Sequence, residues 1–210
     1  MILIKMYRDI KSNGISYTLK KIKNIIKNKF INIYYLYEVD LIDYIKETKI
    51  REKEYKFKLI TKDIIAKMRE EGIISPYKIS ILEDRINNYK ETLNYVVLDK
   101  NGIIMGHFSI ALVNTKKNPY INKNLKIPIK TTYFFDSYTL ENYRRKGVQN
   151  FALLEKINIS KNLGYEKSII LTFDYNIPAQ KAFEAIGMKR KSKIYELNIF
   201  RKKIYERVIK

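Results

Sequence analysis

Apolar and polar positions follow two periods along this chain, and together they predict a mixed domain of helices and strands. Near the start, apolar residues step by three or four, as on one face of a helix. These residues are Ile15, Leu19, Ile22, Ile26, Phe30 and Ile33. Lysines and asparagines lie away from this stripe, so we expect a basic amphipathic helix. A short helix over residues 2–11 precedes it, Gly14 separates the two, and a strand over 33–41 follows.

The middle of the chain predicts a strand, two helices and a hairpin. Tyr55, Phe57 and Leu59 alternate with lysines, which is typical of a half-buried strand. Helical spacing then predicts helices over 61–71 and 79–92. Two strands over 94–99 and 103–113 are joined through Lys100, Asn101 and Gly102, a strong hairpin signal because asparagine and glycine tolerate positive φ. A long basic connection over 114–130 leads to the next strand.

The last third alternates strands with helices. The β-branched and aromatic run 131–139 predicts a buried strand, and helical spacing resumes at Val148. A second apolar strand covers 168–173. The helix after it has start and stop signals at its two ends. Asn176 suits the N-cap, Pro178 the first turn and Gly187 the left-handed C-terminal position. Residues 189–200 predict one or two closing strands, followed by a charged tail.

The loop between strand 131–139 and the helix at Val148 has the composition of an anion site. A helix start presents unpaired backbone N–H groups and the positive end of the helix dipole. Gly147 lets the backbone approach a ligand without a Cβ, and Arg144, Arg145 and Lys146 add positive charge. The sequence therefore predicts a pyrophosphate-binding loop.

Two motifs resemble the GNAT superfamily of acyl-CoA-dependent N-acyltransferases. The family's pyrophosphate loop, R/Q-x-x-G-x-G/A, is matched by Arg144 and Gly147, with Gln149 in place of the usual small residue. Its following signature, N-x-x-A-x-x-x-Y-E-x-x-G-F, is matched at four positions and departs from the family at two. The matches are Asn176, Ala179, Glu184 and Gly187; the departures are Phe183 for tyrosine and Met188 for phenylalanine. The resemblance covers about residues 54–200 and is most specific over 133–188.

The resemblance implies a fold, a cofactor and a reaction. The fold is of the α/β (α+β mixed-sheet) class. Its central sheet is mostly antiparallel and twisted, with splayed strands, and helices flank it. The cofactor is acetyl-CoA, and the reaction is direct attack by a primary amine of a small molecule in a ternary complex. The residues expected to hold coenzyme A are Tyr138, Thr139, Arg144, Arg145, Lys146, Gly147, Val148, Gln149 and Asn176, mainly through backbone groups. Gln149 has to point away from the phosphates.

The acid and base of this reaction have several candidates. Phe183 cannot protonate a thiolate, so Tyr175, Tyr138 or water would have to do so. For the base, Asp136 and Tyr133 lie on the strand before the loop and should point to opposite faces, because their separation is odd. Burial could raise the pKa of Asp136 into a useful range. A salt-bridged structural aspartate and a core tyrosine are the alternatives, and water could also accept the proton.

Composition excludes several classes of site. There is no cysteine, so disulfides, thiolate metal sites and a cysteine nucleophile are ruled out. The single histidine, His107, rules out a histidine cluster, and its strand pattern favours a structural role. We expect no metal site. No apolar stretch approaches the ~20 residues that span a bilayer, and the start lacks the features of a signal peptide. The sequence favours the cytoplasm.

The formal charge of +20 is uneven along the chain. Residues 1–30 hold eight Lys or Arg against one Asp, and residues 189–210 hold nine against two Glu. Lysine, isoleucine, asparagine and tyrosine are abundant together, which indicates a compositional bias, and no arrangement of aromatic and basic residues predicts nucleic-acid binding. The basic helix could contact an anionic membrane surface peripherally or pack on the protein.

Two hypotheses follow for the whole chain. Residues 1–45 form a basic amphipathic extension, and residues 46–210 form a GNAT-like domain. The first hypothesis is an acetyl-CoA-dependent N-acyltransferase. The second is a catalytically weak GNAT-like binding module that its N-terminal helix attaches to a membrane or a partner. The sequence does not identify the acceptor amine, the acyl chain length or the oligomeric state.

Overall fold

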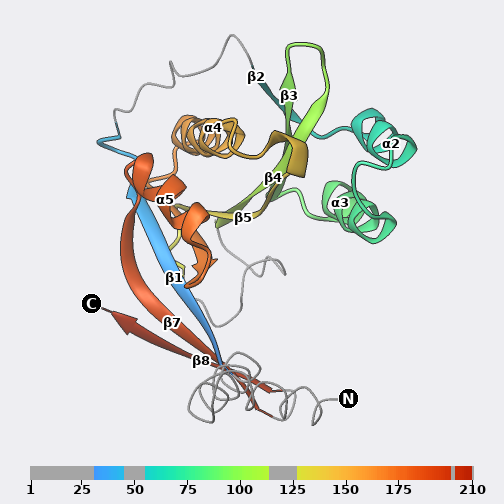
Figure 1. The fold of residues 1–210 in the computed structure, drawn as a ribbon. Coiled ribbons are helices and arrows are strands. Elements are labelled where there is room, and N and C mark those ends of the chain that lie inside the picture. The colour runs from blue at the N-terminus through green and yellow to red at the C-terminus, as the bar shows by residue number, and fades with distance from the viewer. Residues whose placement is uncertain (1–30, 45–54, 114–126, 200–201, 210) are drawn as a thin grey trace, which may run out of the picture. The chain divides into compact units, whose positions relative to one another are not determined.

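A computed structural model describes residues 31–44, 55–113, 127–199 and 202–209 (Figure 1). The helices predicted over 2–33, most of the basic connection over 114–130, and the predicted membrane contact lie largely or wholly outside these ranges. Within them, no helix is both long and apolar enough to cross a bilayer. They also contain no cluster of three or more histidines, aspartates or glutamates that could hold a metal ion.

The described residues form strands and helices in the alternation that the sequence predicts. The strands are β1 (Ile31–Asp40), β2 (Tyr55–Leu59), β3 (Thr92–Asp99), β4 (Ile104–Val113), β5 (Thr131–Thr139), β6 (Lys167–Phe173), β7 (Lys189–Ile199) and β8 (Lys202–Ile209). The helices are α2 (Lys62–Glu70), α3 (Pro76–Asn88), the short 3-10 turn η1 (Glu141–Tyr143), α4 (Val148–Asn162) and α5 (Ile177–Ala185).

Two compact units divide the chain, residues 36–191 and residues 1–35 with 192–210. The first unit holds the strand order β2-β3-β4-β5-β6-β1. The pairs β2–β3, β3–β4 and β4–β5 are antiparallel, and β5–β6 is parallel. The predicted mixed, mostly antiparallel sheet is therefore confirmed. This division differs from the sequence boundary near residue 45, since residues 36–40 of β1 belong to the larger unit.

In the other unit, β7 and β8 form an antiparallel pair that runs from Ser192 with Ile209 to Ile199 with Lys202. The prediction of a charged tail after residue 200 is wrong in this respect, because residues 202–209 are a strand. The many charged residues in this segment gave no strand signal in the sequence. Its backbone pairing with β7 is what makes it a regular strand.

Helices cover both faces of the sheet in the larger unit, with α2 and α3 on one side and α4 on the other (Figure 1). Adjacent strand residues divide between the two layers because side chains alternate across a strand. Val96 and Ile104 join the cluster under α2 and α3, which includes Met68 and Leu82. Their neighbours Val97 and Met105 join the cluster under α4, which includes Val148, Phe151 and Ala152.

Local signals set the helix ends. Thr61 caps α2 by accepting from the Ile64 N–H at 3.4 Å. Helix α3 starts before the predicted residue 79, because Ser75 accepts from the Lys78 N–H and Pro76 occupies the first turn. It also ends before the predicted residue 92, which already belongs to β3. The predicted hairpin after β3 is confirmed, with Gly102 at φ +79°.

Candidate active site

The sheet forks between β5 and β6. Their parallel pairing runs from Thr131 with Lys167 to Phe134 with Ile170 and then stops. Strand β5 continues to Thr139 and β6 to Phe173, so the last part of each has no partner on the side facing the other. The backbone groups of β5 that face β6 beyond Phe134 are therefore not bonded to that strand. This agrees with the splayed strands that the resemblance implies.

A β-bulge interrupts β5 beside the fork. Ser109 pairs with Phe135 and His107 with Tyr138, so Asp136 and Ser137 together oppose a single residue of β4. Asp136 adopts φ 48°, which is uncommon outside glycine. The extra residue reverses the alternation of side chains along the rest of the strand.

The bulge brings Asp136 to the same face as Phe135 and Tyr133. Arg85 shows this, since its guanidinium lies 4.8 Å from the centre of the Phe135 ring and also pairs with the Asp136 carboxylate. The Tyr133 ring stacks on Phe135 with centroids 5.8 Å apart. The expectation that Tyr133 and Asp136 point to opposite faces is therefore wrong, because the odd-separation rule holds only for a regular strand.

Asp136 is a salt-bridged carboxylate. Lys78 and Arg85, both from α3, pair with its two oxygens, and His107 Nε2 lies 3.7 Å from Oδ1. Burial alone would raise the pKa of Asp136, but the nearby His107 ring, the hydrogen bond from Lys78 and the charges of Lys78 and Arg85 outweigh it and hold the pKa well below its usual range. The expected rise in this pKa is thus wrong. A carboxylate held so firmly in its charged form accepts protons poorly.

Tyr133 is also unsuited to accept a proton. Burial raises the pKa of its hydroxyl to about 12, because the phenolate form loses its hydration. The side chain therefore stays a neutral phenol at physiological pH. Its stacking on Phe135 fits the core role that the sequence left as the alternative.

The loop before α4 has the backbone of an anion cradle. Gly147 is the N-cap residue at φ 81°, and no side chain caps this helix end. The first bond of the helix joins the Phe151 N–H to the Gly147 carbonyl at 3.0 Å. The N–H groups of Val148, Gln149 and Asn150 consequently have no acceptor within the helix and lie at the positive end of its dipole. Arg145, at φ 62°, supplies the second left-handed residue of the turn.

Side chains fix this loop to its surroundings. Arg144 donates from Nε to the Thr139 carbonyl at 3.3 Å and lies 5.7 Å from the Tyr138 ring centre, so it ties the loop to the end of β5. Lys146 lies 5.1 Å from the Tyr143 ring. The Tyr55 hydroxyl of β2 donates to the Lys146 carbonyl at 2.8 Å. Sequence reasoning missed Tyr55, which the alternation of β2 marks only as a core residue.

The predicted loop residues differ in how far their side chains are exposed to solvent. Arg144, Arg145, Lys146 and Gly147 are exposed, and Gln149 is half-buried. Val148 is buried at 1% exposure in the cluster under α4, so only its backbone N–H can serve a ligand. The loop thus offers backbone donors inside a rim of basic side chains.

The second motif mainly builds α5. Asn176 accepts from the Ala179 N–H at 3.4 Å as the predicted N-cap, and Gly187 has φ +92° as predicted. Phe183 is buried edge-on against Tyr37, with centroids 5.4 Å apart, and the Tyr37 hydroxyl donates to Glu184 at 2.9 Å. Phe183 is therefore a core residue. Asn176 and its neighbour Tyr175 are exposed.

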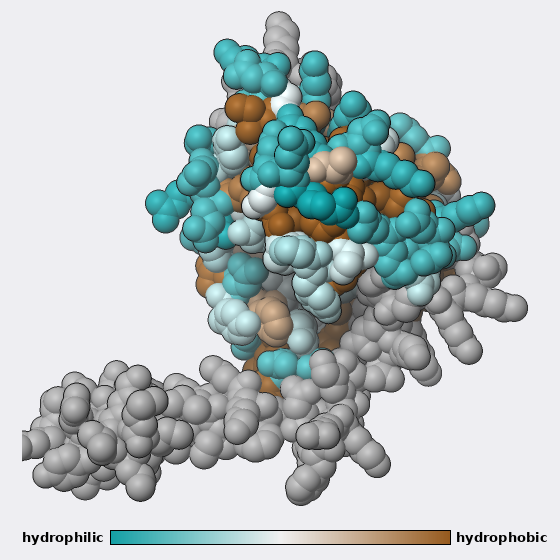
Figure 2. Space-filling model, turned by 90° about the vertical axis from the view of Figure 1, so that its right-hand side faces the viewer, coloured by the Kyte–Doolittle hydropathy of each residue, from teal (hydrophilic) through white to brown (hydrophobic). Residues whose placement is uncertain are grey.

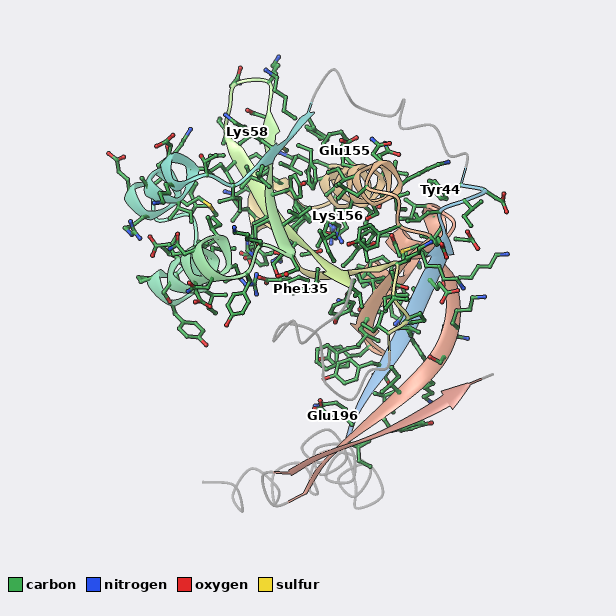
Figure 3. All side chains as sticks on the ribbon, turned by 180° about the vertical axis from the view of Figure 1, so that it is seen from behind. Tyr44, Lys58, Phe135, Glu155, Lys156 and Glu196 are labelled. Carbon is green, nitrogen blue, oxygen red and sulfur yellow. The ribbon has the colours of Figure 1, made fainter. Side chains whose placement is uncertain are left out.

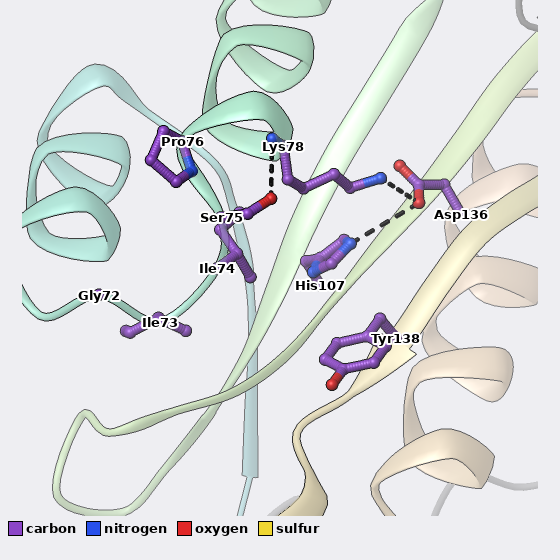
Figure 4. Close-up of a pocket in the computed structure, with 9 residues that line it drawn as sticks. All are labelled: Gly72, Ile73, Ile74, Ser75, Pro76, Lys78, His107, Asp136 and Tyr138. Atoms are coloured by element: carbon purple, nitrogen blue, oxygen red, sulfur yellow. Dashed lines mark hydrogen bonds and ion pairs between the residues drawn. The ribbon is translucent and has the colours of Figure 1, made fainter.

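A pocket of about 620 Å³ opens on the α2–α3 side of the bulge (Figure 4). Its lining comes from the α2–α3 connection, α3 and the two strands at the bulge: Gly72, Ile73, Ile74, Ser75, Pro76, Lys78, His107, Asp136 and Tyr138. Hydrophilic side chains cover much of this side of the molecule, with hydrophobic residues visible between them (Figure 2). The pocket is therefore an amphipathic cavity with ionic groups at one end.

His107 has a more prominent place in the pocket than its strand pattern indicates. Its side chain is 4% exposed, and Nε2 makes no hydrogen bond within the described part of the chain. Tyr138 lies opposite it in the register, with ring centres 5.7 Å apart. The sequence predicted a hydrogen-bonded structural histidine. The pairing of β4 with β5 places this buried ring at the border of the cavity, beside Asp136.

Solved structures share this fold at low sequence identity. A GCN5-related glucosamine N-acetyltransferase region of a fungal multi-domain GH3 β-N-acetylglucosaminidase aligns over 83% of this chain and 22% of its own, at 14% identity and a TM-score of 0.60. A GCN5-related N-acetyltransferase from Sphaerobacter thermophilus aligns over 89% of this chain and 56% of its own, at 9% identity and a TM-score of 0.56.

The chain has the GNAT fold. A functionally unknown conserved protein from Staphylococcus epidermidis also aligns, over 85% of this chain and 65% of its own, at 15% identity and a TM-score of 0.54. The aligned part is thus under two thirds of the length of each of these proteins. No family model matches the sequence, and no curated protein sequence matches it either. The GNAT fold is therefore recognisable here by its backbone and by two short motifs.

Gly106 permits the close approach of β4 to the forked part of β5. A Cβ at this position would lie 2.4 Å from the Tyr138 carbonyl oxygen and 3.1 Å from the Thr139 Cα. We expect Gly106→Ala to displace residues 138–139 and to lower the free energy of unfolding by about 1–3 kcal/mol, since backbone has to move. Urea denaturation measures this change. An unaltered unfolding midpoint would show that the strand accommodates the methyl group.

Proposed function

We propose that this protein transfers an acetyl group from acetyl-CoA to a primary amine of a small molecule by direct attack in a ternary complex. The observation that carries the proposal is the succession of three structural features along β5 and the turn that follows it. These are the fork between β5 and β6, the bulge at Asp136, and the uncapped N-terminus of α4 immediately after β5.

The residues at this end of the sheet fit coenzyme A. The N–H groups of Val148, Gln149 and Asn150 would hold the pyrophosphate, inside the rim formed by Arg144, Arg145 and Lys146. The part of β5 that has no β6 partner would hold the pantetheine arm near Tyr138 and Thr139, and the exposed Asn176 would contact the same arm from α5. The bound cofactor supplies an acetyl group activated as a thioester.

The pocket beside the bulge is the proposed acceptor site. It lies on the α2–α3 side of β5 and is bordered by groups that can orient an amine. Histidine is the residue type that most often accepts protons in catalysis, and His107 Nε2 makes no hydrogen bond in the described structure. We assign His107 as the proton acceptor, with Asp136 orienting the ring and fixing Lys78 and Arg85 around it. Asp136 is thereby a positioning residue.

The two glycines that flank α4 provide a matched test of the cofactor site. Gly147 at the N-terminus has φ 81°, and Gly164 just beyond the C-terminus has φ 79°. Alanine at either position has to adopt a left-handed conformation, at a similar cost of about 1–2 kcal/mol. We expect Gly147→Ala to weaken acetyl-CoA binding at least 10-fold, because the turn that aims the N–H groups changes. Gly164→Ala should bind as the wild type does.

Isothermal titration with acetyl-CoA measures this difference, and urea denaturation of both variants confirms that they are similarly stable. Release of free thiol in the presence of a panel of small amines then measures turnover. Absence of saturable binding at millimolar acetyl-CoA would refute the proposed function. Equal binding by the two glycine variants would refute the loop assignment alone.

A further inference from the structure

Lys156 of α4 is a buried amine next to the fork. Its side chain is fully buried between α4 and the sheet (Figure 3). Nζ lies 4.6 Å from the centre of the Phe134 ring and 5.9 Å from that of Phe108, and it donates a hydrogen bond to Ser137 Oγ at 3.0 Å. No carboxylate pairs with Nζ among the described residues. Such an environment is unusual, since buried lysines are normally paired with an acid.

The surroundings favour the neutral form of this amine. Burial lowers the pKa of Lys156 from 10.5 to about 7, and the charge of Asp136, across the strand, offsets a part of that effect. The other groups that face Nζ are uncharged, namely the Phe108 ring from β4 and the Phe134 ring and Ser137 hydroxyl from β5. Lys156 therefore exchanges its proton near neutral pH.

Ser137 connects this amine to the fork. It follows Asp136 in the bulge, in the segment of β5 that has no β6 partner. Ser137 is half-buried, whereas Lys156 is completely buried. The bulge also turns Ser137 to the α4 face, opposite to Asp136, since it contacts Lys156 while Asp136 contacts α3. The Ser137 hydroxyl is thus the polar group through which a proton can leave Lys156.

We propose that Ser137 and Lys156 form a proton relay that supplies the proton of the departing thiol in the acyl transfer. This inference rests on the proposed function. In the relay, Ser137 gives its hydroxyl proton to the leaving sulfur, so that an O–H bond breaks as the S–H bond forms. Lys156 gives a proton from Nζ to Ser137 Oγ and becomes a neutral amine. The attacking amine gives its proton to His107, which releases it to the solvent, and Lys156 regains one proton from the solvent, so the protons balance over one turnover.

The lowered proton affinity of Lys156 makes this direction favourable. A thiol has a pKa of about 8.5 and an ordinary lysine about 10.4, so an ordinary ammonium would keep its proton in preference to the thiolate. With a pKa of about 7, Lys156 is the stronger acid of the two. The relay would also supply the general acid that the resemblance places at position 183. Phe183 cannot act as an acid, because its side chain has no polar atom and is buried.

The test compares two variants of the relay with one control. We expect Lys156→Met and Ser137→Ala each to lower kcat about 100-fold or more, with the KM for acetyl-CoA changed less than 3-fold, as is typical for loss of a general acid. The double variant should be no slower than the slower single variant, because the two groups act as a unit. Lys161→Met removes an exposed amine from the same helix and should leave kcat unchanged.

A spectroscopic readout separates the relay from a structural role. In the ligand-free protein, the NMR signal of the Lys156 side chain should titrate with a midpoint near pH 7, and kcat of the wild type should fall as pH rises above that midpoint. Lys156→Met should lose this fall. If acetyl-CoA binds and turns over but Lys156→Met retains kcat within 3-fold, the relay is wrong and the proposed function stands. A raised KM with unchanged kcat would likewise overturn it.

Discussion

Replacing Asp136 with asparagine is expected to lower the free energy of unfolding by about 3–5 kcal/mol, because it leaves buried positive charges without their partner. Arg85 and Lys78 both pair with this carboxylate, and their side chains are only 6% and 22% exposed. Asparagine keeps the shape of the side chain but cannot balance either charge. The bulge that carries Asp136 should loosen with it, and cofactor binding at the fork should weaken. Urea denaturation at pH 7 measures the loss.

The exposed ion pair between Lys130 and Glu166 is the control for this experiment. Its two side chains are 64% and 46% exposed, and Glu166→Gln should cost less than about 1 kcal/mol. If the two substitutions lower the free energy of unfolding equally, the idea that Asp136 stabilises the fold by balancing Lys78 and Arg85 is wrong.

The pH dependence of the Asp136 effect has a definite sign. The folded protein holds the pKa of Asp136 below the ordinary value of 3.8, so the carboxylate stabilises the fold at every pH above that value. This contribution is lost as pH falls below 3.8, where the unfolded chain takes up the proton first. The difference in unfolding free energy between the wild type and Asp136→Asn should therefore be constant from pH 5 to 7 and shrink below pH 4.

Replacing Lys156 with methionine is expected to stabilise the fold, in contrast to its predicted effect on turnover. Methionine fills nearly the same volume and has no charge to desolvate. Since one pKa unit corresponds to about 1.4 kcal/mol, the shift of Lys156 to about 7 indicates a gain of roughly 3–5 kcal/mol below pH 7. Urea denaturation of the two proteins at pH 6 measures the gain.

This gain should shrink with rising pH. Between about pH 7 and 10.5 the unfolded chain binds a proton at Lys156 that the folded chain does not, so the stability of the wild type rises through this range relative to the variant. Lys161, in the same helix, is exposed and donates a hydrogen bond to the Tyr44 carbonyl, so Lys161→Met should lower stability by about 1 kcal/mol or less and with no dependence on pH between 6 and 9. If Lys156→Met is less stable than the wild type at pH 6, the idea that burying the Lys156 ammonium costs folding free energy is wrong.

The loop before α4 and the helix itself show what local sequence signals can predict. Gly147 and the apolar spacing from Val148 predicted the start of α4, and the N-cap at φ 81° confirms it. Asn176, Pro178 and Gly187 likewise bounded α5, because caps and left-handed glycines depend on a few neighbouring residues. The GNAT resemblance was confirmed at the level of the fold.

The roles of Asp136, His107 and Lys156 needed contacts between distant segments. The sequence placed Asp136 in an aromatic run and suggested a raised pKa, but Lys78 and Arg85 lie 58 and 51 residues away and reverse the shift. Lys156 belonged to a helical pattern with no sign that its amine would be buried.

By itself, therefore, the sequence determined most of the order of helices and strands, the mixed sheet, the glycine turn before α4 and the absence of cysteine chemistry. Only the tertiary structure decided which side chains meet at the bulge, and thus which carboxylate is ion-paired, that His107 borders the pocket and which lysine is desolvated. The physical reason is that caps and periodicity act over a few residues. A single bulge in β5 instead reverses the faces of every residue after it, and the pKa of each group depends on the charges and the solvent that the whole sheet places around it.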